Sequence, residues 1–162
     1  MQHPPPTHPL TAFAARHPLL LVLLLGCVLT GLCALAGPLL TPPALARWTF
    51  HIREEDEMRA LLGLIGIRHL PIFLLAVTAG QVIFRFVRNT APRTVASASL
   101  PYLLYLIVQG VLDSSAAGEA PFSWVTYEPA YFIWPHFLTV PLGLAAAAHM
   151  VARARRGAPD SQ

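Results

Sequence analysis

The chain has 162 residues, of which 55% are hydrophobic and only 12% are charged, an unusual balance for a soluble domain. The stretch from Pro18 to Ala46 contains no charged residue at all, although about 20 apolar residues suffice to cross a bilayer. Composition and run length therefore exclude a soluble globular fold and predict an all-α integral membrane protein.

The basic side chains indicate what the protein contacts. The formal net charge is +3, and all the cationic side chains are arginines that stand in short clusters beside the apolar runs. A nucleic-acid surface would instead spread them along one polar face with interleaved aromatic residues, so we expect membrane lipids as partners and no nucleic acid. Cys27 and Cys33 point to different sides of a helix, and we expect no metal site.

The first predicted membrane span covers residues 18–40. Residues 1–17 precede it, with four prolines and a single charge, and are predicted to form a disordered tail. Gly26, Gly31 and Gly37 offer small positions at which a neighbouring helix can approach. The alternative is a signal peptide cleaved after Ala36, but an apolar core of this length favours retention as a helix.

The connection that follows has a different pattern. Residues 47–53 alternate polar and apolar side chains, and residues 122–127 are rich in aromatic and β-branched residues, as in strands. If both segments lie on one side of the membrane, they are predicted to pair as a small antiparallel β cap. The alternative is two separate aromatic segments at headgroup level.

Three further spans are predicted at residues 60–84, 94–112 and 129–152, and residues 153–162 form a short tail. The second span contains Arg68, which costs about 3 kcal/mol in the bilayer centre. Its many large aliphatic and aromatic residues contribute roughly −0.5 kcal/mol each and outweigh that cost. The sequence thus predicts one membrane domain, a four-helix bundle over residues 18–152.

Arginines near the span ends predict the orientation. Seven of them fall on one side of the predicted bundle: Arg16, Arg85, Arg88, Arg93, Arg153, Arg155 and Arg156. The opposite side has only Arg47, Arg53 and Arg59, which are diluted by acidic neighbours. By the positive-inside rule the seven face the cytoplasm, so we expect a multi-pass protein of the plasma membrane with both termini inside.

Polar residues within the spans are the candidate functional residues, because hydrocarbon penalises them. Four of them are predicted to lie in the outer half of the bilayer and to form one outward-facing pocket: Arg68, His69, Gln109 and His136. Glu57 and Asp113 are candidate charge partners for the arginine. The alternative is that Arg68 reaches up to the headgroups and that His69 satisfies a backbone carbonyl.

These residues favour a non-enzymatic binding module or accessory subunit, in complex with a membrane-protein partner or with further copies of itself. The alternative is a redox protein with one b-type haem between His69 and His136, since two imidazoles on facing helices can supply both axial ligands. The sequence shows no phosphate loop, nucleophile elbow or zinc motif, which argues against an enzyme.

Overall fold

The computed structural model describes residues 16–40, 57–123 and 130–157. These residues form four helices and no strand, which confirms the all-helical prediction. Each helix is long and apolar enough to cross a membrane. The helices are α2 (Pro18–Leu40), α4 (Glu57–Val87), α5 (Pro92–Ala116) and α7 (Ala130–Gly157).

Helix α5 runs one turn past the apolar segment predicted from the sequence. The predicted span ended at residue 112, where the large apolar residues end, but the helix stops only at the glycine that follows Ala117. Gly118 adopts φ 74°, and its N–H and that of Glu119 donate to the carbonyls of Ser115 and Ser114. This is the Schellman pattern of a helix C-terminus, so backbone geometry rather than hydropathy sets the end of α5.

A four-residue turn joins α4 to α5. Arg88, directly after α4, has the left-handed φ of 57°, which reverses the chain direction at the helix end. The Asn89 side-chain oxygen accepts the N–H of Ala91 at 2.9 Å, and Pro92 begins α5 at a position where its missing N–H has no consequence. This turn fixes two of the predicted cytoplasmic arginines, Arg88 and Arg93, at one end of the bundle.

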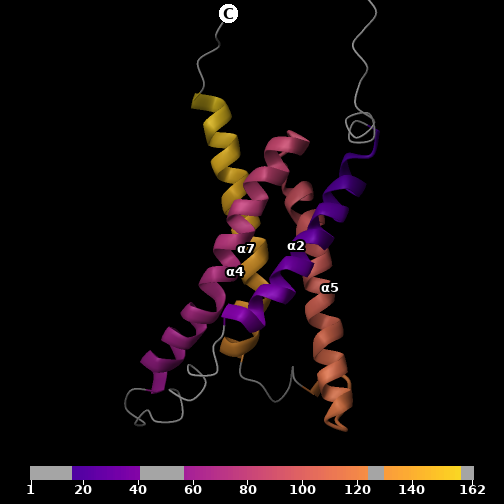
Figure 1. Ribbon diagram of the computed structural model, residues 1–162, viewed down its shortest axis with the longest axis vertical. Coiled ribbons are helices and arrows are strands. Elements are labelled where there is room, and N and C mark those ends of the chain that lie inside the picture. The colour runs from indigo at the N-terminus through magenta and orange to yellow at the C-terminus, as the bar shows by residue number, and fades with distance from the viewer. Residues whose placement is uncertain (1–15, 41–56, 124–129, 158–162) are drawn as a thin grey trace, which may run out of the picture.

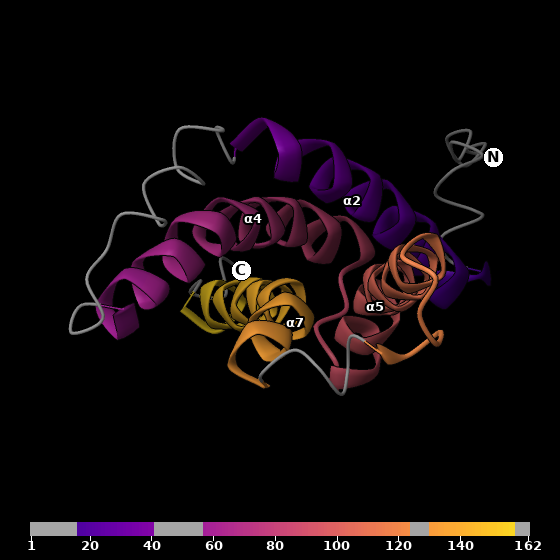
Figure 2. The ribbon, with the colours of Figure 1, turned by 90° about the horizontal axis from the view of Figure 1, so that it is seen from below.

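The four helices pack as a ring in the order α2, α4, α7, α5. Helices α4 and α5 diverge below their short turn, and α4 lies between α2 and α7 (Figure 1, Figure 2). The start of α2, the α4–α5 turn and the end of α7 lie at the same end of the molecule (Figure 1). All seven arginines predicted to share one side therefore lie at that end.

Small residues bring α4 and α7 into close contact. In α4 they are Ala76 and Gly80, and in α7 they are Gly143 and Ala147, each pair four residues apart. A Cβ added at Gly80 would lie 2.8 Å from the Cβ of Ala147, and one added at Gly143 would lie 2.7 Å from that of Ala76. This is the small-xxx-small arrangement that lets membrane helices approach backbone to backbone.

The glycines of the first span divide into two groups. Gly26 packs against α5, where an added Cβ would lie 2.5 Å from the carbonyl oxygen of Ala98, as the sequence predicted. An added Cβ at Gly31 would have nothing within 4 Å, so in the described residues no helix uses this small position for a close approach. The surroundings of Gly37 lie outside the described part of the structure.

The predicted β cap falls almost entirely outside the described residues. Residues 47–53 and 124–127 are not described. Phe122 lies in a turn, which the Ser123 N–H closes by donating to the carbonyl of Ala120 at 2.9 Å. The pairing of the two segments therefore stays a prediction.

The α4–α7 contact predicts opposite effects for two glycine substitutions. Gly143→Ala should lower the free energy of unfolding by about 1–3 kcal/mol, because the new methyl group would lie 3.0 Å from the fixed carbonyl oxygen of Phe73. Gly31→Ala adds the same methyl group where nothing lies within 4 Å, and should be neutral or stabilising by up to roughly 1 kcal/mol. Reversible unfolding in detergent micelles measures both, and equal effects would contradict the packing.

Candidate functional site: a histidine pair between two helices

Two of the predicted site residues meet between α4 and α7. The ring centroids of His69 and His136 lie 4.5 Å apart, with the ring planes at 83°, so one ring presents its edge to the face of the other. His69 is buried with 8% of its surface exposed, whereas His136 is half-buried. His136 is therefore the more accessible of the two rings.

A threonine joins the pair. The Oγ1 of Thr139 lies 3.2 Å from the Nδ1 of His69, and the same hydroxyl donates to the carbonyl of Pro135, one turn earlier in α7. Because a hydroxyl has one hydrogen, it accepts at the histidine. The two bonds of this hydroxyl are therefore compatible when Nδ1 of His69 carries a hydrogen.

The close packing of α4 and α7 sets this geometry. His69 precedes Ala76 by seven residues and His136 precedes Gly143 by seven, which is nearly two full turns in each helix. The residues that let the backbones approach thus lie on the same faces as the histidines. Because the two helices run in the same direction, residues at equal distances along α4 and α7 from the histidines face each other.

The other predicted site residues are not shown to join the pair. Gln109 is exposed on α5, where its amide nitrogen donates to Asp113 Oδ1 at 2.9 Å, and Asp113 is also exposed. Arg68 and Glu57 lie in α4, but their side chains are outside the described part of the structure. The structure thus brings together two members of the predicted pocket, while Gln109 bonds along its own helix.

The spacing of the histidine rings does not suit a b-type haem. An iron held by both rings needs about 2 Å to each nitrogen, with the rings on opposite faces of the porphyrin. The two rings instead touch edge to face at 4.5 Å, with no space for a macrocycle between them. In the described residues, no group of three histidine, cysteine or acidic side chains could hold a metal ion.

Sequence reasoning missed two residues that matter for this region. Thr139 was not singled out, although a hydroxyl three positions after a histidine lies on the same helix face. Arg155 was counted only as a charge near a membrane surface. Its guanidinium donates to the carbonyl of Phe84 at 2.9 Å, in the last turn of α4, so it caps that helix and ties α7 to it.

Comparisons with protein-family models, with curated proteins and with solved structures give no match to this chain.

The bond between α4 and α7 predicts an energetic coupling between His69 and Thr139. In a double-mutant cycle of His69→Phe and Thr139→Val, the coupling should be about 0.6 kcal/mol and at most about 1.7 kcal/mol, the average and the maximum seen for hydrogen bonds between membrane helices. Thr78→Val is the matched control, because the Thr78 hydroxyl donates to the carbonyls of Leu74 and Leu75 of its own helix. Unfolding in micelles measures the cycle, and a coupling as small as that of His69 with Thr78 would contradict the contact.

Proposed function

We propose that the protein is a multi-pass protein of the plasma membrane that binds a polar or anionic group, or a partner subunit, in the outer half of the bilayer without catalysing a reaction. The observation that carries the proposal is the histidine pair. His69 is held by Thr139 and packed against His136, and His136 remains partly accessible.

The exposed side chains support a membrane location. Large apolar residues with about half or more of their surface exposed occur on all four helices, among them Val28, Val82, Val108 and Leu142. Water would penalise so much exposed apolar surface, whereas lipid chains accept it. The exposed faces of the helices are therefore suited to contact with lipid.

The distribution of charge supports the proposed orientation. Seven arginines lie at the end of the bundle that holds the α4–α5 turn, and the acidic residues Asp113 and Glu119 lie at the opposite end of α5. Under the positive-inside rule the arginine-rich end faces the cytoplasm. The histidine pair then lies in the outer half, and a β cap of residues 47–53 and 122–127 would cover that side.

Cysteine labelling tests this orientation. In a chain whose native cysteines are replaced (Cys27→Ser, Cys33→Ala), Ala120→Cys should react in intact cells with a membrane-impermeant maleimide. Asn89→Cys should react only after the membrane is opened, because the α4–α5 turn faces inside. Labelling of Asn89→Cys in intact cells would reverse the orientation and move the histidine pair to the inner half.

The arrangement of the two histidines supports binding at this place. Burying His69 in a lipid-embedded bundle is unfavourable unless its polar atoms have partners, and Thr139 supplies one of them. His136 is the more accessible ring, and it follows Pro135 at a point where α7 lacks one backbone donor. Arg68, the neighbour of His69, adds a positive charge that would favour an anionic group.

Native mass spectrometry of the full chain, extracted from its own membranes in mild detergent, tests the proposed binding. The wild type should retain a non-covalent molecule or subunit, and His136→Ala and Arg68→Leu should each reduce its occupancy at least fivefold. The matched controls are His17→Ala and Arg85→Leu, which change the same residue types at the opposite end of the bundle and should retain it.

An absorbance spectrum of the same samples separates the remaining outcomes. Equal occupancy in all variants would contradict binding at the histidine pair. If His136→Ala only lowers stability and no adduct depends on it, the pair is a structural clamp between α4 and α7. A Soret band that is lost with His69→Ala would contradict the ring geometry and the proposed function, and would establish the haem alternative.

A further inference from the structure

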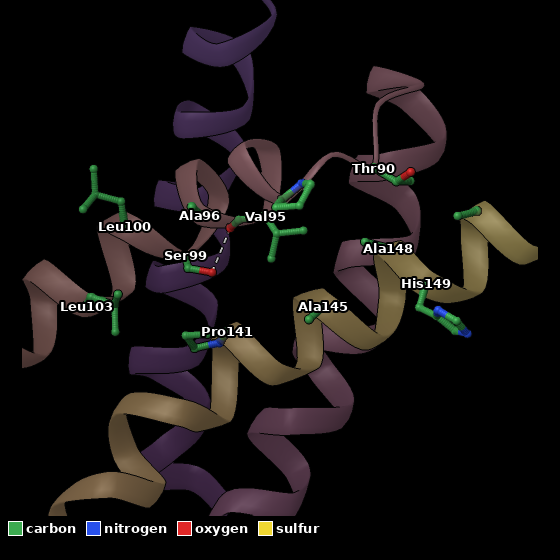
Figure 3. A pocket seen from close by; sticks show the side chains of 12 residues that line it. Thr90, Val95, Ala96, Ser99, Leu100, Leu103, Pro141, Ala145, Ala148 and His149 are labelled. Carbon is green, nitrogen blue, oxygen red and sulfur yellow. Dashed lines mark hydrogen bonds between the residues drawn. The ribbon is translucent and has the colours of Figure 1, made fainter.

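A groove lies between α5 and α7 at the arginine-rich end of the molecule, away from the histidine pair. Its volume is about 700 Å³, and Figure 3 shows Val95 and Ser99 of α5 on one side and Pro141 and Ala145 of α7 on the other. Its remaining lining residues are Thr90, Pro92, Ala96, Leu100, Leu103, Ala148, His149 and Ala152. No residue of α2 or α4 lines this groove.

The lining of the groove is almost entirely apolar. Four alanines form much of it, and their small side chains leave the space that leucines would fill. The hydroxyl of Ser99 donates to the carbonyl of Val95 at 2.9 Å, within its own helix, and so offers no unsatisfied donor to the groove. The interior of the groove therefore suits a hydrocarbon chain rather than a polar ligand.

The length of the groove corresponds to one leaflet. The lining residues extend from Pro92 to Leu103 along α5 and from Pro141 to Ala152 along α7. At about 1.5 Å per residue, eleven residues span roughly 16 Å. The hydrocarbon core of a bilayer is about 30 Å thick, so the groove reaches from one membrane surface to near the midplane.

The mouth of the groove is positively charged. Arg93 follows the lining residue Pro92, and Arg153 and Arg156 lie one turn beyond the lining residues His149 and Ala152. All three arginines are exposed, and neither α5 up to Leu112 nor the whole of α7 contains an acidic residue. Arg155 is different, because it donates to Phe84 of α4.

We propose that this groove binds one anionic phospholipid, with an acyl chain between α5 and α7 and the phosphate at Arg93, Arg153 and Arg156. The apolar lining selects the chain, and the excess of positive charge selects an anionic headgroup over a zwitterionic one. The proposal requires only that the helices lie in a membrane, and it is independent of the ligand at the histidine pair.

Delipidated full-length protein in mild detergent, titrated with dioleoyl-phosphatidylglycerol or with dioleoyl-phosphatidylcholine, tests the proposal by native mass spectrometry. The wild type should bind one phosphatidylglycerol at least tenfold more tightly than phosphatidylcholine. Because both lipids have the same acyl chains, that ratio reports the headgroup alone.

Two kinds of substitution separate the chain site from the headgroup site. Ala145→Leu and Ala96→Leu fill the groove at exposed positions, so each should weaken binding of both lipids at least tenfold. Arg153→Gln and Arg156→Gln should each weaken phosphatidylglycerol binding about fivefold and phosphatidylcholine binding less, because both lipids have the phosphate but only phosphatidylglycerol has a net negative charge. Ala154→Leu, which is exposed on α7 outside the groove, and Arg85→Gln, on α4 at the same end, are the matched controls.

Three results would overturn the proposal: equal binding of the two lipids, wild-type binding by both groove-filling variants, or a dimer that forms in place of the lipid complex. Size-exclusion chromatography and circular dichroism of every variant identify a variant that does not fold. The two groove-filling variants lie on different helices, so one remains informative if the other fails. Loss of lipid binding with an unchanged adduct at the histidine pair would affect this proposal alone.

Discussion

The close contact of α4 with α7 is the constraint on which the rest of the structure depends. His69 and His136, Ala76 and Gly143, and Gly80 and Ala147 are each separated by the same number of positions along the chain, as expected for two parallel helices in register. Because residues seven and eleven positions apart lie on nearly the same helix face, one face of each helix carries the whole contact. The histidines meet because the glycines let the backbones approach.

The forces available in a membrane explain why such a contact is needed. Lipid chains are as apolar as leucine side chains, so burying apolar surface between helices gives little advantage, and close packing with a few polar contacts decides which helices associate. The α4–α7 pair has both, with the bond of Thr139 to His69 on one side of the glycines and that of Arg155 to Phe84 on the other. The groove lies on the other side of α7, between it and α5.

The sequence predicted the helices well because hydrocarbon imposes a length and a composition that can be counted. The ends were less accurate, since α5 continues to Ala116 and α7 to Gly157. At the end of α5, the backbone conformation of Gly118 stops the helix, rather than the loss of apolar side chains. Depth along the helices was also predictable, and it placed His69 and His136 at matching levels. The direction in which each side chain points around its helix could not be predicted. For this reason Gln109 was expected to face the pocket, whereas in the structure it is exposed.

The sequence also could not predict which small residues would face each other on neighbouring helices. The motif formed by Ala76 and Gly80 and that formed by Gly143 and Ala147 are both visible in the sequence, but so are Gly31 and Gly66, which have open space around them. A small residue shows only that a close approach is allowed, and the facing residue on another helix decides whether it occurs.

Helix α7 takes part in both proposed sites, and its two neighbours give those sites different mechanical properties. Toward α4 it is fixed by backbone contacts at Gly143 and Gly80, so the histidine pair has little freedom to separate without disrupting the packed interface. Toward α5 it faces alanines across a groove, so a bound acyl chain can be accommodated by small movements of α5. A ligand at His136, if the proposed binding holds, would therefore be held by a rigid pair of helices. A lipid in the proposed groove would alter the α5 side of the bundle and leave the α4–α7 register unchanged.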